Sequence, residues 1–307
     1  MNTFSFGGNR GRMTLVAPVL WTCAFGSAGC ADTETRYWLG NMVWDHAYTD
    51  EEIATVLGVT GDDVPELLQK YGIDRESSPE KPRDLIRVVP YPGGRHPRIG
   101  FLDGAIDPHR DTKASVFLPW EDAGYVVVDV PEAIGSNKKL VYLAHTHVDT
   151  IWTEQNIELE RLDWERRDRG ELYSHRVFPN GMEFIARIVP GVERVDMELT
   201  LVNGTDAPLK NPLAQNCVLL KGAPDFNGQT NDNKKLLDSG FAATRSRDGR
   251  RWIVTHWDQS RAWANPPCPC MHSDPRFPDL QPGERATSRG WLLFYEGDDV
   301  ESVLRDQ

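Results

Sequence analysis

The feature that most constrains the fold is a series of short segments in which apolar and polar residues alternate, running through residues 85–295. In Arg194–Val202 four apolar side chains occupy one face of an extended chain, and Asp, Glu and Thr side chains occupy the other. Successive side chains of a strand point to opposite faces, so this pattern predicts a strand with one buried face and one solvent face. Such half-buried strands are typical of antiparallel sheets.

Five further segments carry a strand pattern: Tyr125–Val130, Lys139–His147, Met182–Val189, Trp252–Trp257 and Arg289–Tyr295. Dipeptides suited to tight turns lie between such segments, among them Asn180-Gly181, Asn203-Gly204 and Asp248-Gly249. No helical periodicity of any length follows residue 75, and no internal repeat indicates a propeller or a solenoid. Two packed sheets or a closed barrel remain, and we predict an antiparallel β-sandwich over residues 79–307.

Residues 1–30 have the layout of a secretory signal peptide. Two Arg and no acidic residue come first, a mostly apolar run follows over 13–28, and small residues lead into Cys30. The Ser-Ala-Gly-Cys sequence resembles a bacterial lipobox, with Ser27 in place of the usual Leu. We therefore expect an exported protein that is periplasmic, extracellular, or anchored to a membrane through a lipid on Cys30. The alternative is a cytosolic protein whose apolar leader packs against the domain.

Residues 31–78 are expected to form a small helical segment in front of the sandwich. Acidic residues from Asp50 open one helix, Gly58 ends it, and Thr60 caps a second helix. The pair resembles a helix-turn-helix, but its second helix carries three acidic residues against a lone Lys70. The whole chain has 34 basic and 46 acidic residues and a formal net charge of −12. We expect no nucleic-acid partner, because binding nucleic acid depends on neutralising phosphates with Lys and Arg.

Three cysteines follow the leader, namely Cys217, Cys268 and Cys270. An odd number leaves one thiol over in a disulfide framework, so a bridge from Cys217 and a set of free buried thiols are both open. The segment Cys268-Pro-Cys270-Met-His272 contains residue types that bind zinc. Structural zinc sites usually space their paired cysteines by two or more residues, so the spacing here argues against zinc.

The most informative stretch for function is 141–147. His145 and His147 continue the apolar strand face that Val141 begins, and that face is expected to point inward. Burying two imidazoles is costly unless they find partners. Three interpretations stay open: two structural histidines, a polar ligand site without metal, and a site for a divalent metal ion. Glu154 is a nearby carboxylate, although it lies further along the chain than in the His-x-His motifs of cupins.

A second polar cluster runs from His256 to Asn265. His256 is expected to point the same way as Trp252 and Val254, and aromatic and hydrogen-bonding residues follow it. Aromatic rings bind the C–H faces of a sugar, while Arg, Asp and Asn side chains bind its hydroxyl groups. The candidate substrate-binding residues are Trp152, Trp257, Arg261, Trp263 and Asn265.

The order of features over 85–297 resembles the galactose-mutarotase-like proteins. The resemblance is carried by the hairpin series through Met182-Glu183-Phe184 and 195–199, the turn at 203–206, and the closing strand after Pro282-Gly283-Glu284. It implies a large antiparallel supersandwich, of the kind found in sugar epimerases and in domains of polysaccharide lyases and glycosidases. Mutarotases use a His and a Glu as acid and base, but no complete set of those residues aligns here. The resemblance therefore implies a fold and not a reaction.

These features together predict an exported carbohydrate-active enzyme, a lyase, isomerase or hydrolase, with a concave site in the sandwich. The catalytic candidates are His145, His147 and His256, with Glu154 or Asp258 as the carboxylate partner. Histidine suits such chemistry because it titrates near neutral pH. We expect the three histidines to face one pocket, where they could also hold a divalent metal ion; no other cofactor is expected. The alternatives are a non-catalytic carbohydrate-binding lipoprotein with a tryptophan platform, and a cupin-like metalloenzyme acting on a small molecule.

Overall fold

The computed structural model describes residues 28–81, 84–98, 110–145 and 148–305. The chain divides into two compact units, Met1–Ser78 and Pro79–Gln307. No helix within the described ranges is long and apolar enough to span a membrane. Most of the predicted leader, residues 1–27, lies outside these ranges, and Cys30 lies in the first helix.

The first unit is helical, as predicted. It contains α1 (Ala28–Gly40), the π-helical turn η1 (Asn41–Asp45), α2 (Asp50–Leu57), the 3-10 turn η2 (Gly61–Asp63) and α3 (Val64–Tyr71). Thr49 and Glu52 cap the start of α2 reciprocally, and Gly58 ends it in the left-handed conformation at a φ of 67°. A core of its own holds the unit together, formed by residues that include Trp38, Leu39, Met42, Tyr48, Ile53, Val64 and Leu68.

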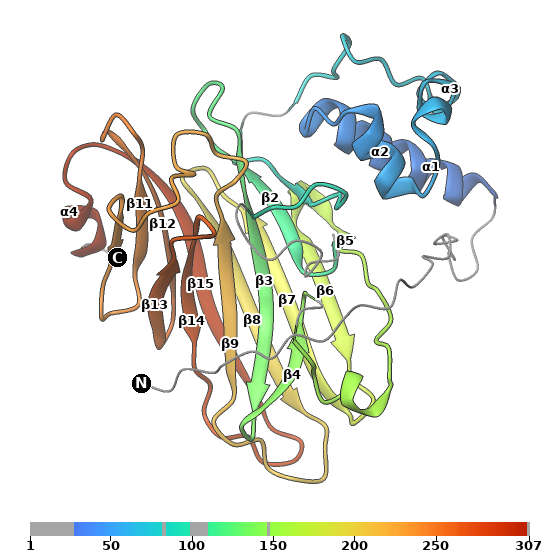
Figure 1. Ribbon diagram of the computed structural model, residues 1–307. Coiled ribbons are helices and arrows are strands. Elements are labelled where there is room, and N and C mark those ends of the chain that lie inside the picture. The colour runs from blue at the N-terminus through green and yellow to red at the C-terminus, as the bar shows by residue number, and fades with distance from the viewer. Residues whose placement is uncertain (1–27, 82–83, 99–109, 146–147, 306–307) are drawn as a thin grey trace. The chain divides into compact units, whose positions relative to one another are not determined.

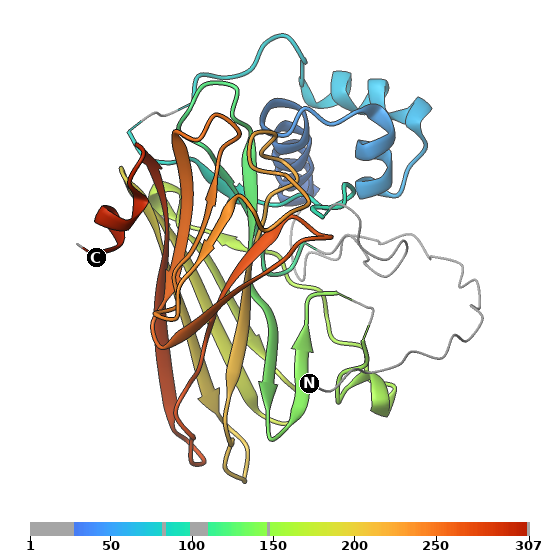
Figure 2. The same ribbon diagram turned by 60° about the vertical axis from the view of Figure 1, so that its left-hand side comes forward.

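The second unit is an antiparallel sandwich of two sheets, which confirms the predicted fold class (Figures 1 and 2). Sheet A has the strand order β1-β2-β3-β9-β14-β13, with β4 paired to β3. Its strands are β1 (Val88–Pro90), β2 (Lys113–Phe117), β3 (Tyr125–Ser136), β4 (Lys139–Leu143), β9 (Leu213–Leu219), β13 (Ser260–Asn265) and β14 (Cys270–Pro275).

Sheet B has the order β10-β11-β12-β15-β8-β7-β6-β5. Its strands are β5 (Glu165–Arg166), β6 (Leu172–Val177), β7 (Met182–Pro190), β8 (Arg194–Asn203), β10 (Lys234–Leu236), β11 (Ala242–Arg245), β12 (Arg251–Trp257) and β15 (Arg285–Glu296). Two 3-10 turns, η3 (Thr153–Gln155) and η4 (Asp168–Gly170), and the C-terminal helix α4 (Val300–Arg305) complete the unit. The six-residue α4 was not predicted.

The main core lies between the two sheets. From β8 it receives the alternating apolar residues of the sequence pattern, Val195, Met197, Leu199 and Leu201, all of them buried. From β3 it receives Val126 and Val128. The predicted inward face of β8 is therefore confirmed.

Part of each outer face of the sandwich is covered as well. On sheet B, Trp252 and Val254 pack in a second cluster with Val300 of α4. On sheet A, Tyr91 and Val127 belong to a third cluster with several cysteines. Because β3 and β12 are buried on both faces, an apolar side chain on either strand does not by itself identify the face that points into the main core.

Candidate active site

A row of chemically reactive side chains crosses the outer face of sheet A. Lys113 of β2 is the cross-strand neighbour of Asp129 of β3, and Asp129 is that of Cys217 of β9. Cys217 lies in turn directly opposite His272 of β14, and His272 lies opposite Trp263 of β13. Directly opposed residues of antiparallel strands have their β-carbons about 5 Å apart, so the five side chains form one continuous line. We call these five residues the polar row.

Strand alternation places the row on this face. On β14, Met271 enters the main core, so Cys270 and His272 point to the outer face. On β3, Val126 and Val128 enter the core, so Asp129 points outward with Val127. The pairing of β3 with β9 is interrupted between Asp129 and Ala133, an irregularity of the kind that re-aims side chains next to active sites.

Glu132 lies within that interruption and reaches the row from one side. Its Oε1 lies 2.9 Å from Nε2 of His145, which follows the end of β4. Its Oε2 lies 3.7 Å from Nε2 of His272 and accepts no hydrogen bond from any residue that the structure describes. One buried carboxylate thus stands between two imidazoles.

Arg98 completes the environment of His145. The Arg98 guanidinium forms an ion pair with Glu132, and its Nη2 also lies 3.1 Å from Nε2 of His145. That imidazole nitrogen therefore faces an acceptor and a donor. When protonated it can donate to Glu132, and when deprotonated it can accept from Arg98. Both protonation states of His145 have a hydrogen-bond partner in place.

A second buried ion pair lies beside the first. Nζ of Lys113 is 3.0 Å from Oδ2 of Asp129, and the two side chains are 1% and 0% exposed. Thr112 donates to the other oxygen of Asp129 at 2.6 Å. The Asp129 carboxylate also lies 3.8 Å from Nε2 of His145. Burying ion pairs generally contributes little to stability, so a cluster of them marks a candidate functional site.

Three cysteines lie in and beside the other half of the row. Cys217, Cys268 and Cys270 are buried free thiols. Of the two alternatives left open by the sequence, the structure therefore has the free thiols and not a disulfide from Cys217. A hydrogen bond from the Cys217 thiol lowers the pKa of Cys270 to about 4, and burial raises the pKa of Cys217. Burial alone would lower the pKa of His272, but its contacts with Asp274 and Cys270 raise that pKa.

The row ends at the rim of sheet A. Trp263 is half-buried, and its ring stacks on His272 with 3.8 Å between centroids. Its Nε1 donates to Asp274 at 2.5 Å. Arg261 and Asn265 share the face of Trp263 because they lie two residues before and after it on β13. Arg261 is exposed, so this end of the row is where the site meets solvent.

The prediction that His145 and His256 face one pocket is wrong. His256 does point the same way as Trp252 and Val254, but that direction is the outer face of sheet B. Its ring stacks on Phe241 at 4.2 Å between centroids, and burial lowers its pKa. His145 lies on the outer face of the other sheet, so the two cannot share a metal ion. The third member of the proposed set, His147, lies outside the described residues.

The predicted carboxylate partners are also not beside His145. Glu154 is exposed in η3, and Asp258 is exposed in the turn after β12. Two of the proposed platform residues are core residues, since Trp152 and Trp257 are 3% and 1% exposed. Their burial corrects their assignment to a binding platform. Trp263, Arg261 and Asn265 are the predicted binding residues that the structure places beside the row.

Sequence reasoning missed Arg98, Lys113, Asp129 and Glu132. A signal was present on β3, where Asp129 and Glu132 interrupt a run of valines. A second signal was the alternation of Cys270, His272 and Asp274 with other residue types, which puts all three on one face of a strand.

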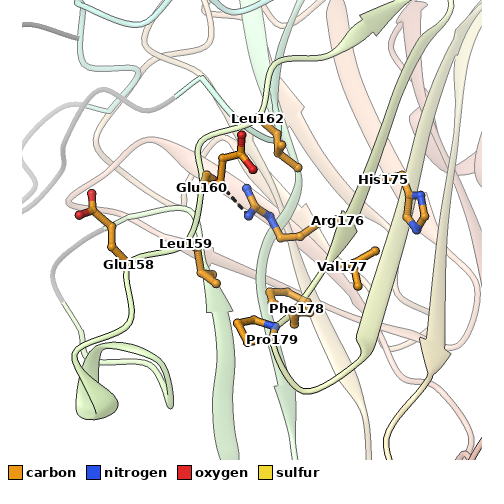
Figure 3. Close-up of a pocket in the computed structure, with 9 residues that line it drawn as sticks. All are labelled: Glu158, Leu159, Glu160, Leu162, His175, Arg176, Val177, Phe178 and Pro179. Carbon is orange, nitrogen blue, oxygen red and sulfur yellow. Dashed lines mark hydrogen bonds between the residues drawn. The ribbon is translucent and has the colours of Figure 1, made fainter. Parts of the chain in front are cut away.

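A surface hollow of about 420 Å³ beside β6 offers less chemistry (Figure 3). Its Arg176 donates to the backbone carbonyl of Glu160 at 2.8 Å and forms an ion pair with Asp111. Nε2 of its His175 lies 2.6 Å from Oε2 of Glu183 and, as Figure 3 shows, the imidazole lies well apart from Arg176. Arg176 and His175 are therefore engaged separately and do not converge on one point.

No family model and no curated protein matches the chain. Similar solved structures include a protein described as an aldose 1-epimerase from Klebsiella pneumoniae, with 12% identity and a TM-score of 0.31 over 65% of this chain and 58% of that chain. A polysaccharide lyase, BACCELL_00875, matches with 10% identity and a TM-score of 0.37 over 72% and 34% of the two chains. A protein described as a kojibiose phosphorylase from the human microbiome matches with 7% identity and a TM-score of 0.35 over 60% and 25%.

All three are carbohydrate-active enzymes by description, and the chain spans between 25% and 58% of their lengths. An aldose 1-epimerase, the class expected from the sequence resemblance, is among them. Likeness at these TM-scores establishes no shared activity.

Proposed function

We propose that this chain is a carbohydrate-active enzyme that works by general acid–base catalysis, with His145 and Glu132 as the proton-transferring pair. The observation that carries the proposal is the 2.9 Å contact between His145 Nε2 and Glu132 Oε1 at a buried position. A carboxylate within hydrogen-bond reach of a histidine can orient the imidazole and stabilise its protonated form, which is the arrangement of a histidine that moves protons.

The neighbouring charges suit proton transfer. Arg98 contacts both members of the pair, so it can stabilise negative charge that develops on a substrate oxygen as a proton leaves. The Lys113–Asp129 pair lies beside His145 and balances its own charge. Fixed charges in a water-poor site need little reorganisation during the reaction, which is why such sites are effective.

Carbohydrate is the proposed substrate class because of the rim of the polar row. The half-buried Trp263 supplies an aromatic surface, and Arg261 and Asn265 flank it with hydrogen-bonding groups. A sugar needs this combination, since its C–H faces stack on rings and its hydroxyl groups bind polar side chains. The segment 91–97 contacts the face that bears the row, so its displacement would open the His145–Glu132 pair to a substrate while Arg98 keeps its contacts with the pair.

The proposal is tested by incubating the purified protein with free aldoses and with uronate-containing oligosaccharides in D₂O. Proton NMR detects anomeric exchange, deuterium uptake at carbon and chain cleavage in one measurement. We expect turnover of at least one class, and a loss of about 10²–10⁴-fold in rate for H145Q and E132Q. The matched controls are E154Q and D258N, which remove the exposed carboxylates and should keep the wild-type rate.

Glu132 also pairs with Arg98, so melting temperatures are recorded for every variant. Folded H145Q protein that keeps the wild-type rate would overturn the assignment of His145. Absence of all three NMR changes on every carbohydrate tested would overturn the substrate class.

A further inference from the structure

Cys217 and His272 of the polar row, together with Cys270 beside them, have the composition of a metal centre. Ligand atoms of Cys217, Cys270 and His272 all lie within 4.8 Å of one another, and the three residues are buried. Two thiolates and one imidazole are a known ligand set for zinc, with a fourth position left to water or another oxygen ligand. Soft sulfur ligands favour zinc over magnesium or calcium. The spacing of Cys268 and Cys270 in the sequence does not indicate this ligand set, because Cys217 comes from another strand, β9.

The imidazole is oriented as a metal ligand would be. Nδ1 of His272 lies 3.4 Å from Oδ1 of Asp274, a close polar contact that is not aligned as a hydrogen bond. Asp274 is itself held by the indole of Trp263 and by the backbone N–H of Asn216 at 3.0 Å. Metal-binding histidines commonly donate their second N–H to a carboxylate, and Asp274 is the carboxylate beside Nδ1. Nε2 is then the nitrogen left for the metal.

A buried acceptor faces the fourth position. Oε2 of Glu132 is 3.7 Å from Nε2 of His272, and no described residue donates a hydrogen bond to it. The Glu132 side chain is 6% exposed, so this oxygen is well shielded from water. A buried carboxylate oxygen without a donor is costly, and a cation or a cation-bound water beside it would remove that cost.

Charge balance also permits a divalent ion. Arg98 pairs with Glu132 and Lys113 pairs with Asp129, so these four buried charges cancel. A divalent cation with two thiolates adds no net charge to the cluster. Binding displaces to solvent the protons that the three ligand side chains still hold and forms two metal–sulfur bonds and one metal–nitrogen bond, so the balance of protons and charge closes.

We propose that Cys217, Cys270 and His272 bind a zinc ion, with the fourth position directed at Glu132 and Asp274 orienting the histidine. The ion would lie at the centre of the polar row, next to the His145–Glu132 pair. The proposal does not rest on the proposed enzymatic function, because its evidence is the ligand geometry and its test is metal content.

The test uses the full chain purified without chelators. Elemental analysis should give about one zinc ion per folded chain, as a site with three protein ligands and one open position implies. Replacement of the zinc by cobalt should produce visible absorption from tetrahedral Co²⁺ and near-ultraviolet charge transfer from the thiolates. The cobalt spectrum is recorded on the wild-type chain, so it does not depend on any variant folding.

Variants then identify the ligands. C217S and C270S should lose the metal, while D274N should keep it with an affinity lower by about 10–100-fold, the usual effect of removing a group that orients a metal ligand. The matched control is C268S, which removes a neighbouring buried thiol that is not in the ligand group and should leave the zinc content unchanged. A wild-type chain without zinc or thiolate–cobalt absorption overturns the site, as does equal metal loss in C268S and C270S.

Discussion

Trp263 stacks on His272 and at the same time donates its indole N–H to Asp274, the carboxylate next to the His272 ring. One aromatic side chain at the rim of sheet A therefore fixes both an imidazole and the group that orients it. Because Trp263 is half-buried, part of its side-chain surface remains accessible to solvent and to ligands.

Substitutions at Trp263 should separate these two roles. W263F keeps an aromatic ring over His272 but removes the hydrogen bond to Asp274, and should lower the free energy of unfolding by about 1–2 kcal/mol. W263A removes the stacking as well and should cost more. Urea unfolding measures both values. Equal stability of W263F and the wild-type chain would contradict a structural role for the indole N–H.

The buried Lys113–Asp129 pair should behave differently from a surface pair. Removing one partner leaves an uncompensated buried charge, so K113M or D129N alone should cost about 3–5 kcal/mol. The double variant K113M/D129N leaves no such charge and should cost less than the sum of the two single variants. Urea unfolding of the three proteins completes the cycle.

The matched control is the exposed Lys210–Asp279 pair, whose side chains are 52% and 44% exposed at a distance of 2.9 Å. Solvent screens that pair, so the corresponding variants K210M and D279N should each change stability by about 0–1 kcal/mol. If the losses of unfolding free energy in K113M and D129N simply added up in the double variant, the two buried charges would not stabilise each other.

The fold could be predicted from the sequence because its signals are local. The alternation in β8 fixes which side chains enter the core, and Thr49, Glu52 and Gly58 mark the ends of α2. The limits of several strands could not be predicted. β3 continues to Ser136 and β4 stops at Leu143, because pairing with neighbouring strands and not residue type decides where a ladder ends.

The site depended on information that no local pattern contains. His145 was found from its apolar surroundings, but its partner Glu132 lies on another strand at an interruption of the sheet. The direction of His256 was misjudged because β12 is apolar on both faces, one for the main core and one for α4. Cross-strand register brings Cys217 to His272, and register is set by pairings between strands that are distant in sequence.

The acid side of the stability curve should depend on His96. Burial, together with the positive charges of Lys221, Arg98 and Lys113, lowers the pKa of His96 from 6.5 to about 4. Between these values the unfolded chain binds the proton and the folded chain does not, so stability should fall as the pH drops from 6.5 towards 4. Below about pH 4 both states bind the proton, and this contribution stops changing.

The measurement is urea unfolding of the wild-type chain, H96N and K221M across that pH range. H96N removes the titrating group and should show a shallower loss of stability than the wild type. K221M removes one of the neighbouring charges, which moves the His96 pKa back towards its usual value and should give an intermediate slope. Parallel curves for the wild type and H96N would show that His96 contributes nothing to the acid sensitivity.

The packing of Trp257 makes a final prediction about the core. Gly290 of β15 is the cross-strand partner of Trp257, and the indole lies over it, so that a β-carbon at position 290 would come closer than 3.0 Å to the ring. Trp257 is 1% exposed and cannot move aside without disturbing the main core. G290A should therefore lower the free energy of unfolding by about 1–3 kcal/mol, the usual cost of overpacking.

The matched control is G135A in β3, where the nearest atoms to an added β-carbon are 3.6 Å away. That substitution should be neutral or stabilise by up to about 1 kcal/mol, because it reduces the entropy of the unfolded chain. Urea unfolding of the two variants gives the comparison, and a G290A protein as stable as G135A would mean that the indole is free to shift.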